Sequence, residues 1–260
     1  MVPDTQTSPS GQEWDKLAVE HGAQLGAVVG FHITEQMANY IDITQKTAIL
    51  KSIRWNKTLN VLDVGCGDGR ISYWLSEKVN QVVGFDFSEK MIEKAKKTHS
   101  RTNIAYHLGT IENIDLPDAH FDCAILVYVF KHITEDAAIM DLIDNISRKL
   151  KPGGRIIFIE SIGISSQHEA VNRIDKDFSI DYIVRRNQTY VDIMAKAGYK
   201  LTYNAGVRWN LVKYFSFLGI PDFTGGVKRI ITKIIMYKDQ ILGIIFKTRC
   251  NEQIFVFTKN

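Results

Sequence analysis

The sequence predicts an α/β protein built on a doubly wound, mostly parallel β-sheet. Apolar strand patterns alternate with helical patterns from Leu59 to Ile159, the order expected when helices cover both faces of a parallel sheet. The first strand, Leu59–Val64, runs into a turn with glycine at positions 65, 67 and 69, and the second, Val82–Phe85, ends at Asp86. A glycine turn and an acid after neighbouring strands indicate a ligand site at the carboxyl edge of the sheet.

The spacing of the glycine turn narrows the choice of ligand. A dinucleotide fingerprint needs its third glycine at position 70, where this chain has Arg70, and a P-loop needs a Gly-Lys-Ser/Thr sequence, which is absent. The chain instead has an acid two residues before the first glycine, in the order Asp63-x-Gly65-x-Gly67-x-Gly69. Glycine lets a ligand lie against bare backbone, and the acid suits a ligand with an ammonium group better than a pyrophosphate.

The remaining elements lie on either side of this alternation. Helical apolar spacing at 14–19 and 35–53 precedes the first strand, and a helix is expected at about 188–197. Strands are expected from Tyr199 to about Ala205 and from Gln253 to Thr258. The predicted organisation is a disordered lead at 1–12, amino-terminal helices at 13–56, a core formed by 57–206 and 251–260, and an insertion at 207–250.

These motifs resemble those of the class I S-adenosylmethionine-dependent methyltransferases, particularly the broad type-11 group. The glycine turn and Asp86 are followed by two further elements similar to the family's, Gly109–Asn113 and Leu150–Arg155. The resemblance implies a Rossmann-like sheet of seven strands in the order 3-2-1-4-5-7-6, with the last strand antiparallel. It also implies that the amino-terminal helices form a lid and that the 207–250 insertion is a helical cap over the pocket.

S-adenosylmethionine is the cofactor that the resemblance implies. Asp86 would hold the ribose and Phe87 would pack against the adenine. The family usually has Asp where Thr110 stands, so either the Thr110 hydroxyl accepts from the adenine amino group or Glu112 does. The cofactor-binding residues implied by the resemblance are Asp63, Gly65, Gly67, Asp86, Phe87, Thr110, Ile111, Glu112 and Val127.

Methyl transfer to a hydroxyl or amine needs alignment and a base that takes the acceptor's proton. The candidate base is His132, just past the fourth strand; the alternative is that this histidine fixes its loop by a backbone hydrogen bond. Tyr128 and Glu160 are expected to point toward the acceptor. His21 stands where the family's Trp-Asp-x-x-Ala-x-x-Tyr lid has Tyr, and His32 is a further candidate lid residue. The alternative for this stretch is an ordinary amphipathic helix.

Positive charge is concentrated in one segment. The whole chain has a net charge of +3, yet residues 225–250 contain six Lys and Arg against the acid Asp239, a net charge of +5. Apolar residues at near-helical spacing accompany these cations, which fits either a cap helix with a solvated basic face or contact with a membrane surface or an anionic ligand. Because the charge is local and no RNA-binding module is visible, we expect no nucleic-acid partner.

The sequence thus predicts a methyltransferase acting on an oxygen, with nitrogen as second choice, of a small molecule such as a sugar or secondary metabolite. The alternatives are a lipid or quinone methyltransferase at a membrane surface and a catalytically silent cofactor-binding scaffold. Three widely spaced cysteines, Cys66, Cys123 and Cys250, fit a reducing compartment, and none suggests a metal site. Without a recognisable signal segment or membrane-length apolar run, a cytoplasmic location is expected.

Overall fold

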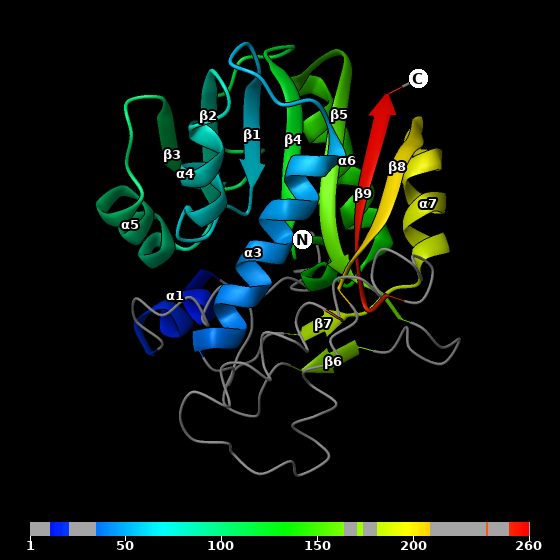
Figure 1. Cartoon of the computed structure of the whole chain (residues 1–260), viewed down its shortest axis with the longest axis horizontal. Coiled ribbons are helices and arrows are strands. Elements are labelled where there is room, and N and C mark those ends of the chain that lie inside the picture. Colours follow the sequence, from blue (N-terminus) through cyan, green and yellow to red (C-terminus); the bar gives the residue numbers. More distant parts are fainter. Residues whose placement is uncertain are drawn as a thin grey trace, which may run out of the picture.

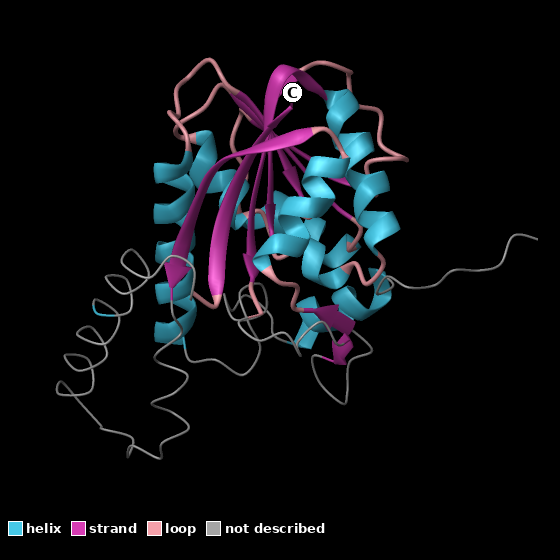
Figure 2. Ribbon diagram, turned by 90° about the vertical axis from the view of Figure 1, so that its right-hand side faces the viewer, coloured by secondary structure: helices cyan, strands magenta, loops and turns pink. Residues whose placement is uncertain are grey.

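A seven-stranded sheet with helices on both faces organises the protein (Figures 1 and 2). The structure is a computed structural model that describes residues 11–20, 35–163, 171–173, 181–208, 238 and 250–259. The strand order is β3-β2-β1-β4-β5-β9-β8, and β9 is antiparallel to both of its neighbours. Since β8 and β9 are the sixth and seventh strands of this sheet, the predicted order and the antiparallel last strand are confirmed.

The elements follow the predicted alternation of strands and helices. The strands of the main sheet are β1 Asn60–Val64, β2 Gln81–Asp86, β3 Ile104–Leu108, β4 Phe121–Val127, β5 Leu150–Ser161, β8 Tyr199–Arg208 and β9 Glu252–Lys259. The helices are α1 Gly11–Glu20, α3 Glu35–Ser52, α4 Arg70–Ser76, α5 Glu89–Thr98, the 3-10 turn η1 Phe130–His132, α6 Asp136–Lys149 and α7 Asn187–Lys196.

Two differences from the sequence prediction concern the added segments. β6 (Val171–Arg173) pairs with β7 (Asp181–Ile183) within the link between β5 and α7; strands of three residues are too short to show an alternating pattern. Helix α1 begins at Gly11, inside the expected lead 1–12. Nearly all of the 207–250 insertion lies outside the described residues, so its helical cap stays a prediction. In the described parts of the chain, no helix is long and apolar enough to cross a membrane.

The central strands are buried on both faces, as expected of a parallel sheet between helices. Alternate residues point to opposite sides: Val61 and Ile125 pack with residues of α3 and α4, whereas Leu62 and Leu126 pack with residues of α6 and α7. Strands β1 to β5 are parallel, so their carboxyl ends lie at one edge of the sheet, the lower edge in Figure 1. Helix α1 and the β6–β7 pair lie beyond this edge.

A cluster of aromatic rings ties the segment after β4 to the core. The Phe158 ring of β5 lies 4.8 Å from Phe255 and 5.7 Å from Phe257 in stacked geometry, and 5.0 Å from Phe130 in edge-to-face geometry. Tyr190 of α7 contacts the same ring at 5.4 Å. Because Phe130 is the first residue of η1, this cluster sets where the residues that follow it can lie.

Replacing Phe158 with Ala should destabilise the protein by about 3–5 kcal/mol, because the fully buried ring fills the centre of this cluster and leaves a cavity. Urea unfolding followed by circular dichroism would measure the loss. The control is Val19→Ala, since Val19 is 66% exposed and should change stability little. A loss below about 1 kcal/mol at Phe158 would contradict a central role for this ring.

Candidate active site

The glycine turn connects β1 to α4 in a conformation that needs glycine. Gly65, Gly67 and Gly69 have φ angles of 63°, 54° and 80°, in the left-handed region that other residues rarely adopt. Space is restricted as well: a Cβ on Gly65 would lie 2.8 Å from Cγ2 of Val129, and a Cβ on Gly69 would collide with the Tyr106 hydroxyl. The turn therefore presents bare backbone at the carboxyl edge of the sheet.

Asp63 lies beneath this turn and is only 2% exposed. The Ser72 hydroxyl donates a hydrogen bond of 2.6 Å to its Oδ2 atom, which holds the first turn of α4 against β1. Burial raises the pKa of Asp63 to about 6, although the Ser72 hydrogen bond acts in the opposite direction. Asp63 thus holds the start of α4 in place beside the glycine turn. Its contact with a ligand ammonium group stays a prediction.

Asp86, at the end of β2, is joined to the glycine turn. The Gly67 N–H donates to its Oδ2 at 2.9 Å and the Ser88 N–H donates to its Oδ1 at 3.0 Å. Burial raises the pKa of Asp86, and these backbone donors oppose the rise. A carboxylate has about four acceptor positions, so Asp86 retains capacity for further donors. The next side chain, Phe87, is apolar and 40% exposed.

The segment after β3 contains the residues considered for adenine. The Thr110 N–H donates to Oδ1 of Asn113 at 2.8 Å, and Ile111 is buried. The exposed Glu112 accepts a hydrogen bond of 2.9 Å from Nδ2 of Asn145, in α6. The Glu112 carboxylate thus has one donor from a helix, and both alternatives for the adenine contact stay predictions.

Helix α1 spans from the end of β2 to the segment after β4. Oδ1 of Asp15 accepts hydrogen bonds from the Ser88 hydroxyl at 2.5 Å and from the Lys90 N–H at 3.0 Å. One residue earlier, the Trp14 ring lies edge-to-face on His132, with centroids 5.0 Å apart. Sequence reasoning did not identify this role of Asp15. A carboxylate is a suitable partner for the free N–H groups at a helix start, but Asp15 is far from Ser88 in the sequence. His21 and His32 lie outside the described residues.

His132 ends η1 and is held by a backbone carbonyl. Its Nδ1–H donates to the Asp181 carbonyl, in β7, at 3.4 Å; this assignment of the proton leaves Nε2 as the acceptor atom. Burial lowers the pKa of His132 well below its usual value, and the positive charge of Lys131 contributes. The imidazole is therefore neutral near pH 7, the form that can accept a proton.

Two buried charged side chains hold the backbone around His132. Oε1 of Glu160 accepts from the Lys131 N–H at 3.4 Å. On the other side, the Arg185 guanidinium donates to the carbonyls of Phe130 and Ile133 at 3.1 and 2.8 Å. Glu160 is fully buried, and burial raises its pKa to about 7 against the effect of the Lys131 charge. Sequence reasoning missed Arg185, because nothing in its local pattern distinguishes it from a surface arginine.

Tyr128 directly follows Val127, the last residue of β4, and has an unusual backbone conformation. Its φ of +60° is in the left-handed region, which turns the chain so that Val129 packs on Gly65. Nη2 of Arg208 donates to the Tyr128 hydroxyl at 2.6 Å, and the same atom lies 2.6 Å from Oε2 of Glu252. The Tyr128 side chain thus contacts the ends of β8 and β9, where the 207–250 insertion begins and ends.

The methyltransferase domain family matches residues 61–154 of this chain, the stretch that contains the glycine turn, Asp86 and His132. Residues 61–154 are thus a methyltransferase domain, similar to those of S-adenosylmethionine-dependent methyltransferases. The cofactor of this family is S-adenosylmethionine. The matched residues cover nearly all of β1, then β2 to β4 with the segments that follow these strands, and the start of β5.

Two relatives are similar to this chain in sequence, and a solved structure is similar to it in fold. The chain is 34% identical to the demethylmenaquinone methyltransferase of Lactococcus lactis over 40% of the chain and 42% of the relative. It is 35% identical to the ubiquinone biosynthesis O-methyltransferase of Idiomarina loihiensis over 38% of the chain and 40% of the relative. It therefore spans less than half the length of these relatives.

A crystal structure of an S-adenosylmethionine-dependent methyltransferase from Mesorhizobium loti has a TM-score of 0.59 at 18% identity, covering 83% of this chain and 98% of the other.

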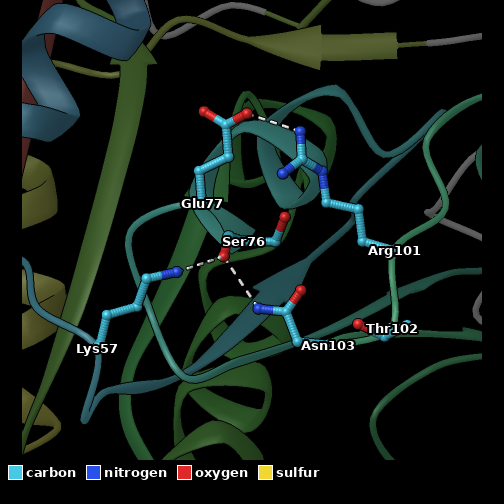
Figure 3. Close-up of a pocket in the computed structure, with 6 residues that line it drawn as sticks. All are labelled: Lys57, Ser76, Glu77, Arg101, Thr102 and Asn103. Carbon is cyan, nitrogen blue, oxygen red and sulfur yellow. Dashed lines mark hydrogen bonds and ion pairs between the residues drawn. The ribbon is translucent and has the colours of Figure 1, made fainter.

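A surface depression of about 720 Å³ lies elsewhere on the methyltransferase domain, near the amino end of β3 (Figure 3). Its polar groups bind one another: the Ser76 carbonyl accepts from Lys57 and Asn103, and Arg101 lies 2.6 Å from Glu77. It is at the opposite edge of the sheet from the glycine turn. We therefore assign it no part in methyl transfer.

Removing the ionisation of Asp63 should change how stability depends on pH. Its pKa in the folded protein, about 6, is above the ordinary value of 3.8, so the folded state binds this proton more tightly. The free energy of unfolding should therefore fall by about 2 kcal/mol on this account as pH rises from about 4 to 6, and by about 3 kcal/mol over the whole range from pH 3 to 7. The Asp63→Asn variant keeps an oxygen that can accept from the Ser72 hydroxyl, but its amide does not ionise, so its free energy of unfolding should not show this fall. Urea unfolding between pH 4 and 7 would test this, and parallel curves for the two proteins would contradict it.

Proposed function

We propose that this chain transfers the methyl group of S-adenosylmethionine to an oxygen, with nitrogen as second choice, of a small-molecule acceptor such as a sugar or secondary metabolite. The observation that supports this is the position of α1. One turn of this helix contacts both the Asp86 side of the site, through Asp15 and Ser88, and the His132 side, through Trp14. In the proposed arrangement, the nucleoside of the cofactor and the proton acceptor His132 would both lie beneath α1.

The residues around the glycine turn fit the cofactor. Gly65 and Gly67 offer bare backbone to the methionine part, and Asp86 retains acceptor capacity for the two ribose hydroxyls. The exposed Phe87 ring offers an apolar face to adenine. Either the Thr110 hydroxyl or a remaining acceptor position of the Glu112 carboxylate would accept from the adenine amino group. When bound, S-adenosylmethionine supplies an activated methyl group.

The work left to the protein is alignment and proton removal. Nε2 of the neutral His132 would accept the proton of the acceptor hydroxyl as the oxygen attacks. The Asp181 carbonyl fixes the ring through Nδ1, and Trp14 packs against it edge-to-face, which limits the access of water. The buried Glu160 carboxylate accepts from the Lys131 N–H, so in this proposal it positions the segment that contains His132.

A quinone or lipid acceptor is the second candidate. It is favoured by the similarity to the two quinone-pathway methyltransferases and by exposed apolar side chains on the amino-terminal helices, with Val19 66% and Ile43 59% exposed. Flotation with anionic liposomes tests this candidate. Binding to liposomes together with methylation of a demethylquinone would favour it over a water-soluble acceptor.

A panel of candidate acceptors, incubated with the full chain and S-adenosylmethionine and analysed by mass spectrometry, would test the proposed activity. The expected result is a product heavier by one methyl group, with S-adenosylhomocysteine formed in equal amount. Cofactor binding without turnover of any acceptor, across hydroxyl, amine and quinone classes, would favour a catalytically silent scaffold.

Asp86→Ala should weaken cofactor binding at least about tenfold, or about 1.4 kcal/mol, because two ribose hydroxyls lose their acceptor. Titration calorimetry with S-adenosylhomocysteine would measure this. Asp86→Asn is the matched variant: it keeps an oxygen for Gly67 but loses the charge, so its affinity should be intermediate. Unchanged affinity in both variants would contradict the placement of the ribose.

His132→Ala should lower kcat about a hundredfold or more while leaving cofactor affinity nearly unchanged. Because burial lowers the pKa of His132, the wild-type rate should stay flat from pH 6.5 to 8. His132→Asn separates catalysis from structure, since the Asn amide can still donate to the Asp181 carbonyl. Wild-type turnover in His132→Asn would show that the histidine serves only to fix its loop.

A further inference from the structure

Lys131, in η1, has an ammonium group without a carboxylate partner. Its Nζ atom lies 4.0 Å from the centroid of the Tyr128 ring, and the side chain is half-buried. Across the described residues, no carboxylate oxygen comes within 4.0 Å of this nitrogen. A cation–π contact contributes less to stability than the removal of an ammonium group from water costs.

The two nearest acids are committed to other donors. Glu252 accepts from Nε2 of Gln45 at 2.9 Å and lies 2.6 Å from Nη2 of Arg208. Glu160 accepts the Lys131 N–H, and its pKa of about 7 means that part of this carboxyl group is protonated near neutral pH. Burial accordingly lowers the pKa of Lys131, with both acids only partly opposing the effect. The charge of the ammonium group is therefore only partly balanced by these two acids.

Tyr128 points to a functional reason for this arrangement. Glycine would adopt a φ of +60° freely, whereas a tyrosine there is strained by about 1 kcal/mol or more. The side chain provides what glycine would not: its ring supports the Lys131 ammonium and its hydroxyl accepts from Arg208. Two cationic groups are thus held around one ring at the carboxyl end of β4.

The position of Lys131 relative to His132 suggests which molecule supplies the anion. The two residues are neighbours in η1, and the Lys131 charge contributes to the lowered pKa of His132. The Lys131 charge therefore acts on the His132 ring across a short distance. An anion bound at Lys131 would belong to the molecule that gives its proton to His132.

We propose that Lys131 binds an anionic group of the methyl acceptor, a carboxylate or a phosphate. This inference rests on the proposed function, because it takes the acceptor to lie beside His132. The anion completes the charge balance around the Lys131 ammonium and fixes the end of the acceptor that is not methylated. Lys131 is thus a specificity-determining residue that selects acidic acceptors over their neutral analogues.

Anion binding can be measured without any turnover. The full chain, with and without S-adenosylhomocysteine, is melted in increasing sodium phosphate or sodium acetate against sodium chloride of equal ionic strength. Wild type should be stabilised by at least one of the two anions beyond chloride, and the anion that acts identifies phosphate or carboxylate chemistry. Lys131→Met should lose at least about fivefold in apparent affinity for that anion, while Lys131→Arg should retain most of it. The matched control is Lys151→Met, which removes a cation paired with Asp122 at the other end of the sheet.

Equal anion affinity in wild type and Lys131→Met would overturn the inference, whatever the acceptor turns out to be. Failure of S-adenosylhomocysteine to bind wild type would instead count against the proposed function.

A second experiment compares pairs of acceptors that differ only in having a free acid or its methyl ester. Wild type should prefer the acid at least about tenfold in kcat/KM, and Lys131→Met should abolish the preference through KM with cofactor KM unchanged. A preference that survives in Lys131→Met would place the anion elsewhere.

Discussion

The segment after β4 must satisfy its buried backbone groups, and the rest of the site depends on how it does so. A buried N–H or C=O without a partner costs about 1–3 kcal/mol, and water has little access here. The Glu160 carboxylate accepts from the amide of Lys131, and the Arg185 guanidinium donates to the carbonyls of Phe130 and Ile133. These charged hydrogen bonds are stronger than neutral ones, so they hold His132 and Lys131 in one place.

Helix α1 depends on that placement. Its Trp14 ring rests on His132, while Asp15 binds the start of α5 through Ser88 and Lys90. A carboxylate at a helix start satisfies free N–H groups and favours the positive end of the helix dipole. Helix α1 is therefore held both at the start of α5 and at His132, and a change at either contact affects the same helix.

Helix α3 connects the glycine turn with the last two strands through buried polar groups. The Arg70 guanidinium, just after the turn, donates to Asp42 and Gln45 of α3. Gln45 in turn donates to Glu252 of β9, which pairs with Arg208 of β8. Breaking such a buried network by removing one member is costly because it leaves an uncompensated charge. The network thus fixes the base of the 207–250 insertion relative to the cofactor turn.

The sequence by itself determined the alternation of strands and helices and the glycine turn, and the resemblance of its motifs to a known family predicted the strand order. Local rules decide the first two features: alternating strand and helix patterns favour a parallel sheet, and glycine adopts without strain the left-handed conformation found at Gly65, Gly67 and Gly69. The pairing of Asp86 with the turn also follows, because neighbouring strands end at one edge.

Only the tertiary structure decided how Arg185, Asp15 and Lys131 act. Arg185 and Asp15 contact residues about 50 and 75 positions away, and no local pattern encodes such a separation. Lys131 follows Tyr128 closely in sequence, but the lack of a counter-charge around its ammonium depends on where β5, β8 and β9 place Glu160, Arg208 and Glu252.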